Sequence, residues 1–295
     1  MFSNKRIKVE VVLSNKYDIL GSTQNLVFED FKIDVMAKRV ENAIGPTASI
    51  KIYGVSKEYM DSITTLLFRD TIEIEDKRVI VWVDNGTGYF KLFEGWITEA
   101  VPVYRSAPDC YIQIESSMAA YENNMKLPPI SFENESVAIS SICDAVCAAY
   151  GVKSYTSDLV KIQPNVNGKK LRLGSNNEGL NVRVGQLCEA YGLRAFRVID
   201  GYKFFMKSEK GDETLFIFTP ETIIGYPSYK NKLIQVETED FNSIELNNQF
   251  KITGSEIPYA NGLWYVSIIE YVLQSWTPNG KWQAIIYGGP VGGSK

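Results

Sequence analysis

The sequence contains no histidine among its 295 residues. Without an imidazole the chain cannot build a Ser-His-Asp or Cys-His catalytic centre, and it lacks the usual nitrogen ligand of catalytic zinc. Cysteine is scarce as well, because only Cys110, Cys143, Cys147 and Cys188 are present and they lack zinc-ribbon spacing. We expect these four side chains to remain thiols in a reducing cytoplasm.

Long apolar runs and nucleotide-binding motifs are also missing. No stretch approaches the roughly 20 apolar residues that a membrane-spanning helix needs, and the first residues lack the apolar core of a signal peptide. Neither a P-loop nor a GxGxxG fingerprint occurs. We therefore expect no membrane contact and no bound cofactor or metal.

The composition is that of an ordinary folded protein. Hydrophobic residues are 45% and charged residues 22%, which argues against disorder, collagen and coiled coil. The net charge is −4 and the isoelectric point is about 5.2. A dedicated nucleic-acid binder would carry a basic face, so this balance fits better a conduit along which DNA slides without binding.

Residues 1–117 predict a first β domain, built as a barrel or sandwich with one short helix. Alternating apolar and polar side chains indicate half-buried strands, and a helix is expected from Ser56 as its N-cap. The turn sequence 84–88 predicts a hairpin after an apolar strand, 79–83. The expected strands are 31–35, 48–52, 71–75, 79–83, 90–93 and 111–115, and the helix carries Tyr59, Met60, Ile63, Leu66 and Leu67 on one stripe.

Residues 118–213 predict a mixed α/β domain. Helices are expected over 136–150 and 181–191, each followed by a glycine suited to a left-handed C-cap, Gly151 and Gly192. The inward residues are expected to be Ile139, Ile142, Cys143, Val146, Cys147 and Tyr150 on the first helix, and Val184, Leu187, Cys188 and Tyr191 on the second. A β-hairpin over 194–206, with its turn at Asp200-Gly201, completes this domain.

Residues 214–295 predict a second β domain. Its expected strands are 216–218, 233–237, 249–252, 264–269 and 282–286, with Pro278-Asn279-Gly280 as the turn of the last hairpin. The fold class is therefore mainly β with an α/β insertion.

Two groups of residues could carry chemistry, and in both a structural role is favoured. Cys143 and Cys147 lie four residues apart on a helix, which is the spacing of a metal or redox pair, but their neighbours are apolar and core packing is the simpler role. The carboxylates of 237–240 or of 73–76 could form a glycosidase pair, although residues that alternate along strands usually face water. We expect no enzymatic activity.

Three stretches of the chain follow one another in a distinctive order. The first runs from Ala48 to Ser56 and returns through Phe93-Glu94-Gly95-Trp96-Ile97, and the second is the α/β region. The third is a Gly-aromatic-Pro turn, a strand, a P-x-A-N-G turn and a closing Trp strand. Together these stretches resemble a family of bacteriophage proteins, the hub proteins of contractile-tail baseplates, and also the hub-like part of secretion-system spike proteins. The interface motif residues that this resemblance identifies are Gly95, Gly225, Tyr226, Pro227, Pro258, Asn261, Gly262, Trp264 and Trp282. One departure is Asn247-Asn248, where the family usually has a glycine-containing turn.

The resemblance implies two tube-like β domains, 1–117 and 214–295, flanking an α/β domain, 118–213. It also implies a homotrimeric ring that joins a six-fold tail tube, or its initiator protein, to a three-fold spike. Tape-measure and baseplate wedge proteins are further implied partners, and DNA passes through the lumen without specific binding. The expected location is the virion tail baseplate, after assembly in the bacterial host cytoplasm.

Two other functions remain open from the residues themselves. A carbohydrate-binding β module would expose Trp82, Trp96 or Tyr259 in a groove, since aromatic rings stack on sugars. A peptidoglycan-hydrolysing tail component would need a carboxylate of raised pKa in a cleft of sugar size.

Overall fold

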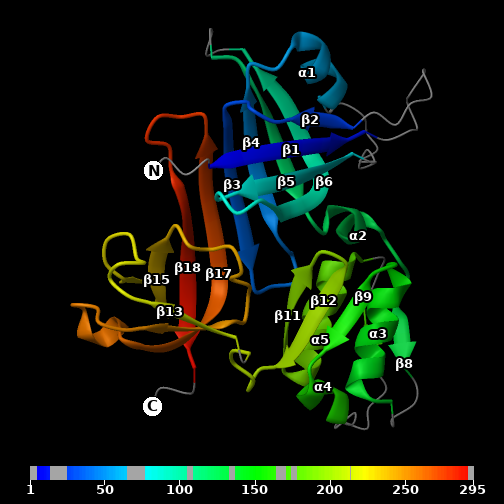
Figure 1. Ribbon diagram of the computed structural model, residues 1–295. Helices are drawn as coiled ribbons and strands as arrows, with labels where there is room; N and C mark the ends of the chain where they lie inside the picture. The colour runs from blue at the N-terminus through cyan, green and yellow to red at the C-terminus, as the bar shows by residue number, and fades with distance from the viewer. Residues whose placement is uncertain are drawn as a thin grey trace. The chain divides into compact units, whose positions relative to one another are not determined.

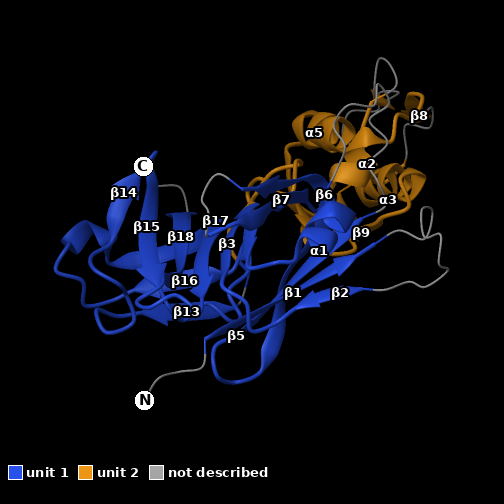
Figure 2. Ribbon diagram, turned by 90° about the horizontal axis from the view of Figure 1, so that it is seen from above, with its two compact units in different colours: residues 1–39, 46–118, 212–295 blue, residues 40–45, 119–211 orange. Residues whose placement is uncertain are grey.

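The computed structural model describes residues 5–13, 25–64, 77–104, 109–132, 137–163, 171–173, 178–212 and 214–291. The fold is mainly β, as predicted. The chain forms two compact units, which Figure 2 shows in different colours. Unit 1 comprises residues 1–39, 46–118 and 212–295, and unit 2 comprises residues 40–45 and 119–211.

Unit 1 contains a sheet of thirteen strands, drawn in Figure 1. Along its main path the strand order is β14-β15-β18-β17-β3-β4-β7-β6-β5-β1-β2, while β16 pairs with β17 and β13 pairs with β16. The elements of its N-terminal part are β1 (Arg6–Val12), β2 (Leu26–Phe28), β3 (Ile33–Val40), β4 (Thr47–Tyr53), α1 (Lys57–Ile63), β5 (Arg78–Asp84), β6 (Tyr89–Val103) and β7 (Tyr111–Ser117). Those of its C-terminal part are β13 (Leu215–Phe218), β14 (Ser228–Lys230), β15 (Leu233–Thr238), β16 (Gln249–Ile252), the 3₁₀ turn η2 (Pro258–Ala260), β17 (Gly262–Ser275) and β18 (Trp282–Pro290).

The N-terminal and C-terminal β segments meet where β17 lies beside β3. At the end of β17 the buried hydroxyl of Ser275 accepts a hydrogen bond from the Ile33 amide at 3.2 Å and donates one to the Phe31 carbonyl at 3.0 Å. These two hydrogen bonds join residues that are 242 and 244 positions apart in the sequence. The division into a β domain 1–117 and a second β domain 214–295 stays a prediction.

The core of unit 1 follows the period of two that the sequence displays. In β4 and β7 every second residue is buried, so that Ile50, Ile52, Ile112 and Ile114 are fully covered. Although the sequence of β5 is apolar from 79 to 83, only its alternate residues 79, 81 and 83 face the core. Its Trp82 faces outward, where the ammonium of Lys8 lies 5.0 Å from the centre of the indole ring.

The helix α1 begins at the predicted N-cap. The Ser56 hydroxyl accepts a hydrogen bond from the Tyr59 amide, and Met60 and Ile63 are buried. Tyr59 is exposed, contrary to the predicted stripe, because the helix has only seven residues and its buried side chains are Met60 and Ile63. The predicted positions Leu66 and Leu67 and the predicted strand 71–75 lie outside the described residues.

Unit 2 has a three-stranded sheet of order β11-β12-β9, in which β9 runs parallel to β12. Its elements are α2 (Ala120–Asn124), β8 (Ile130–Phe132), α3 (Ile139–Ala149), β9 (Lys153–Thr156), α4 (Asp158–Ile162), β10 (Leu171–Leu173), α5 (Leu180–Tyr191), β11 (Leu193–Val198) and β12 (Gly201–Met206). The core gathers the inward faces of α3 and α5 against the sheet. The two predicted helices of the middle region are therefore present.

Two details of unit 2 depart from the sequence-based expectations. The two-residue turn of the β11–β12 hairpin is Ile199-Asp200, since Gly201 already pairs with Val198 as the first residue of β12. A Cβ at position 201 would lie 2.1 Å from the Lys153 carbonyl oxygen of β9. On α5 the buried positions include Arg183, whereas Cys188 and Tyr191 are only half buried. The Arg183 guanidinium donates to the Leu127 and Pro128 carbonyl oxygens, which allows a cation to lie inside.

Candidate functional site

The Gly-aromatic-Pro turn precedes the edge strand β14. Gly225 has a φ of +73°, which a side chain would disfavour, and Pro227 is buried whereas Tyr226 is 66% exposed. The loop is held on β15 by a hydrogen bond from the Ile224 amide to the Glu237 carbonyl oxygen at 2.7 Å. Its geometry therefore presents the tyrosine ring to the outside.

The P-x-A-N-G turn lies directly before β17. Pro258 is the first residue of η2, where its fixed φ suits a helical turn. The Asn261 side chain closes the preceding loop, since its amide group donates to the Ser255 carbonyl oxygen and its oxygen accepts from the Ser255 amide, both at 2.9 Å. Gly262 then begins β17, and the Trp264 indole donates to the Ala260 carbonyl oxygen at 3.0 Å.

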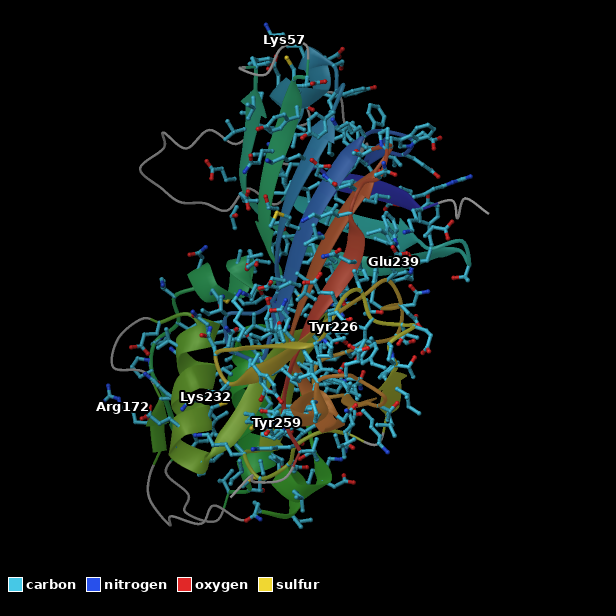
Figure 3. The ribbon with its side chains drawn as sticks, turned by 90° about the vertical axis from the view of Figure 1, so that its left-hand side faces the viewer. Lys57, Arg172, Tyr226, Lys232, Glu239 and Tyr259 are labelled. Carbon is cyan, nitrogen blue, oxygen red and sulfur yellow. The ribbon has the colours of Figure 1, made fainter. Side chains whose placement is uncertain are left out.

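These two turns meet on one surface. The Tyr229 hydroxyl of β14 donates to the Tyr259 carbonyl oxygen at 2.5 Å, and its ring lies edge-on to Trp264 with 6.2 Å between the ring centres. Tyr259 is 84% exposed. We name the exposed side chains Tyr226, Tyr229 and Tyr259 the tyrosine patch. Figure 3 shows Tyr226 and Tyr259, together with Lys232, far from Lys57 of α1.

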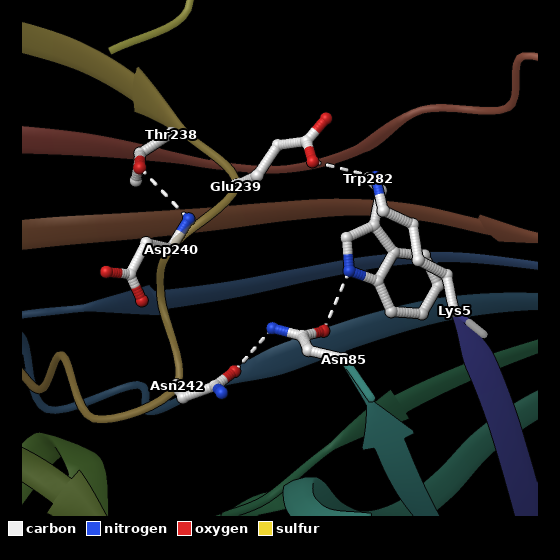
Figure 4. Close-up of polar contacts among 7 residues, drawn as sticks. All are labelled: Lys5, Asn85, Thr238, Glu239, Asp240, Asn242 and Trp282. Atoms are coloured by element: carbon white, nitrogen blue, oxygen red, sulfur yellow. Dashed lines mark hydrogen bonds and ion pairs between the residues drawn. The ribbon is translucent and has the colours of Figure 1, made fainter. Parts of the chain in front are cut away.

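Trp282 belongs to a different part of unit 1. It is buried at the start of β18, and its indole donates to the Asn85 side-chain oxygen of the β5–β6 turn at 2.8 Å (Figure 4). Asn85 in turn donates to Asn242, and Lys5 pairs with Glu239 at 2.8 Å. These contacts join the N-terminal segment to the C-terminal segment. Trp282 therefore stabilises the interior of unit 1, and its buried ring is not accessible to a binding partner.

Among the predicted motif residues, Gly95 belongs to neither of the two turns. It is in the middle of β6, where a Cβ would lie 2.7 Å from the Phe93 ring and 2.8 Å from the Ser116 hydroxyl oxygen. Only a glycine allows this close packing. The structure thus brings the turn residues together with Trp264, and leaves Gly95 and Trp282 in structural positions elsewhere.

The departure at Asn247-Asn248 has a local explanation. Asn247 adopts a φ of +69°, a conformation that asparagine tolerates better than most residues with a side chain. Asn248 accepts a hydrogen bond from the Glu245 amide and donates to the Asp212 carboxylate. An asparagine pair therefore forms the turn for which a glycine would otherwise serve.

The cysteines of unit 2 are packing residues. Cys143 and Cys147 are fully buried on α3, and burial raises the pKa of the Cys147 and Cys188 thiols to about 12. Burial raises the pKa of Cys143 as well. In the described ranges no three histidine, cysteine, aspartate or glutamate side chains group as metal ligands would.

Two of the acidic groups considered for glycoside hydrolysis, Glu237 and Glu239, are engaged in other contacts. Glu237 accepts hydrogen bonds from Gln235 and Gln283, and Glu239 pairs with Lys5. Burial raises the pKa of the Glu41 carboxyl, because it outweighs the opposing charge of Arg194, whose guanidinium lies 2.7 Å away. Residues 73–76 lie outside the described residues.

The tryptophans considered for sugar binding are covered by cations. Lys91 as well as Lys8 lies over the Trp82 ring, at 5.7 Å, and the Arg78 guanidinium lies 5.5 Å from the centre of the Trp96 ring. An aromatic ring that stacks on a sugar needs a free face. Of the three residues predicted for a sugar groove, Tyr259 alone is largely exposed.

Sequence reasoning missed two residues that the structure singles out. Asn85 and Ser275 both connect the N-terminal and C-terminal segments, and no motif in the sequence indicates these contacts. The signal for Ser275 was its position at the end of the alternating residues of β17, directly before the turn 276–281. A serine that is buried there needs hydrogen-bond partners. For Asn85 the turn sequence concealed the role, since asparagine is already favoured there.

Comparison with known sequences finds no matching family model and no matching curated protein. Solved structures do match. The 43 kDa tail protein of prophage MuSo2 from Shewanella oneidensis has a TM-score of 0.61 at 12% identity, and the tail protein from Neisseria meningitidis MC58 has 0.61 at 7% identity, each with 96% of both chains covered. This chain has the fold of phage tail proteins.

A third structure extends the likeness to secretion systems. It is an E. coli protein described as a component of the type VI secretion system with structural similarity to the bacteriophage T4 tail proteins gp27 and gp5. Its TM-score is 0.59 at 8% identity, with 88% of this chain and 74% of that chain covered. The resemblance predicted from the sequence is confirmed at the level of the fold. Within the described residues, no helix is long and apolar enough to cross a membrane.

Proposed function

We propose that this protein is a structural, non-enzymatic component of a phage tail or of a tail-derived injection machine, acting as the hub of its baseplate. The observation that carries the proposal is the shared fold with two phage tail proteins over 96% of each chain. The likeness to a secretion-system component supports the wider class of machine.

In this role three copies form a ring that adapts a six-fold tail tube to a three-fold spike. The large sheet of unit 1 supports this arrangement, because a ring of copies covers strand edges that a single chain leaves open. The partners are the tube or tube-initiator protein on one side and the spike on the other, with tape-measure and wedge proteins nearby. The site of action is the virion tail.

The lumen of the ring lets DNA pass without holding it. The net charge of −4 supports this, since a basic channel would attract phosphates. The protein is therefore expected to show no sequence-independent DNA affinity at physiological salt.

Light scattering combined with negative-stain electron microscopy tests the proposal. We expect a mass three times that of the 33.2 kDa chain and a three-fold ring with a central hole. A protein that stays monomeric at high concentration would contradict the ring, and a zymogram that clears peptidoglycan would contradict the non-enzymatic role.

A further inference from the structure

Four asparagines of the chain directly precede a glycine, namely Asn85, Asn167, Asn261 and Asn279. An asparagine in this position is prone to spontaneous deamidation, because glycine has no Cβ to hinder attack by its backbone nitrogen. Asn167 lies outside the described residues. The structure places the other three in unit 1 and gives their side chains different surroundings.

The chemistry of deamidation sets two requirements on the structure. The backbone nitrogen of the glycine attacks the side-chain carbonyl carbon of the asparagine and forms a bond to it. The carbon–nitrogen bond of the side-chain amide breaks, and ammonia leaves with the proton that the glycine nitrogen gives up. Water then opens the succinimide ring at either carbonyl, which yields aspartate or isoaspartate. The side chain must therefore be free to turn, and the glycine nitrogen must leave its own hydrogen bond.

The side chain of Asn85 is held at both of its polar atoms. Its oxygen accepts a hydrogen bond from the Trp282 indole at 2.8 Å, and its amide group donates to Asn242 (Figure 4). The Gly86 amide donates to a carboxylate oxygen of Asp84 at 2.7 Å. These three hydrogen bonds must break before the Gly86 nitrogen can react with the Asn85 side chain.

Asn261 is held in a similar way. Its side chain forms two hydrogen bonds with the backbone of Ser255, one as donor and one as acceptor, both at 2.9 Å. Gly262 begins β17 and pairs with Ile252 of β16. Ring closure at Asn261 would therefore undo both the loop that precedes η2 and the end of a strand pair.

Asn279 differs from both. It lies at the tip of the β17–β18 hairpin, residues 276–281, and is exposed. Within the part of the chain that the structure describes, its side chain has no hydrogen-bond partner. It has a φ of +54° as the third residue of the turn 277–280, which is closed by a hydrogen bond from the Gly280 amide to the Thr277 carbonyl oxygen at 2.9 Å. Among the described contacts, that single bond has to break.

This turn can open without separating the strands. Gln274 and Lys281 remain joined by two hydrogen bonds, from the Gln274 amide to the Lys281 carbonyl oxygen at 2.8 Å and from the Lys281 amide to the Gln274 side-chain oxygen at 3.0 Å. An exposed turn beyond such a closed ladder opens at a small cost in free energy. The Gly280 nitrogen is therefore released far more often than the rest of the sheet unfolds.

We propose that Asn279 is a site of spontaneous deamidation in the folded protein, whereas hydrogen bonds to their side chains protect Asn85 and Asn261. The inference goes beyond the proposed function and needs no enzyme, since water is the only co-reactant. The product adds one negative charge to the hairpin tip next to Lys281. In its isoaspartate form it also adds one carbon to the main chain.

Peptide mapping by mass spectrometry tests the site in the full-length protein, incubated at mildly alkaline pH. We expect Asn279 to gain the mass difference of deamidation at least about 10-fold faster than Asn85 and Asn261, because two further hydrogen bonds hold each of those side chains. In urea the three should react at comparable rates. A native Asn279 that is no faster than the other two would overturn the proposal, and so would a difference that persists in urea.

Two variants sharpen the test. Asn279→Gly tolerates the positive φ and should abolish most of the isoaspartate, measured as methyl transfer from S-adenosylmethionine by an isoaspartyl methyltransferase. Asn242→Ala, at an exposed residue, removes one of the bonds that hold Asn85 and should speed its deamidation about 5-fold, with Asn261 as the unchanged internal control. An unchanged Asn85 rate, in a variant whose circular dichroism matches the wild type, would contradict protection by hydrogen bonds.

Discussion

Unit 1 and unit 2 are built in different ways from the same chain. Unit 1 takes residues from three separate segments and joins them in one sheet, so that its register depends on contacts between residues more than 200 positions apart. Unit 2 is nearly continuous in sequence, with helices packed on a small sheet. The comparison shows that the large sheet needs both ends of the chain, whereas most of the smaller core is local.

The two units also differ in their buried polar groups. Unit 1 buries neutral ones, such as Ser275 and Asn248, in hydrogen bonds. Unit 2 buries charged ones, because the Arg197 guanidinium lies 2.6 Å from the Glu122 carboxylate and both side chains are less than a tenth exposed. Breaking such an ion pair leaves a charge without a partner in a medium of low dielectric constant.

The largest effect is expected from the core of unit 1. Phe250 is fully buried, edge-on to Phe218, and its ring contacts the position of Gly288 so closely that a Cβ there would lie 2.4 Å away. Phe250→Ala should lower the free energy of unfolding by about 4 kcal/mol. Urea unfolding measures the change, and hydrogen exchange should assign the loss to peptides of unit 1. Protection lost in unit 2 alone would contradict the assignment.

A slightly smaller effect is expected from the ion pair of unit 2. Arg197→Met should destabilise the protein by about 3 kcal/mol, because Glu122 remains buried without its partner. The double variant Arg197→Met/Glu122→Leu should recover most of this loss in the same urea experiment. If the single variant is as stable as the wild type, the pair is not buried in solution.

A smaller loss of stability is expected from the junction between the N-terminal and C-terminal segments of unit 1. Ser275→Ala leaves the Ile33 amide without a partner inside the sheet, and we expect a loss of about 2 kcal/mol. Exchange of the Ile33 amide, followed by NMR, checks the prediction directly. Thr277→Ala, at the adjacent tip, is the control, since its side chain is only partly buried and makes a long hydrogen bond of 3.3 Å to the Ser275 carbonyl.

The smallest effect on stability, but a clear one on reactivity, concerns the thiols of unit 2. With a pKa raised from 9.0 to about 12, Cys147 and Cys188 should carry about 10³-fold less thiolate at pH 8 than in the unfolded chain. Ellman's reagent should therefore modify them slowly in native Cys110→Ser protein and rapidly in urea. Because their folded pKa is raised, their contribution to stability is complete below pH 9 and is lost as the pH rises toward 12. Rapid native modification would show that this core opens.

Local patterns predicted most of the elements. The alternation in 48–52 and 111–115 predicted β4 and β7, and Ser56 predicted the start of α1, because each depends on neighbours within a few residues. The tyrosine patch was predicted in part, since Tyr226 and the turn before Trp264 were identified. Tyr229 was missed because nothing in its own sequence indicates that it meets Tyr259.

The sequence by itself determined most of the strands, the two long helices of unit 2 with their glycine ends, and most of the turns, because backbone preferences and side-chain periodicity act over short distances. Only the tertiary structure decided that β17 lies beside β3 and that Trp282 binds Asn85. It also decided that Arg183 is buried and Trp82 faces outward. Strand order and register depend on which distant faces fit together, and no local pattern specifies that fit.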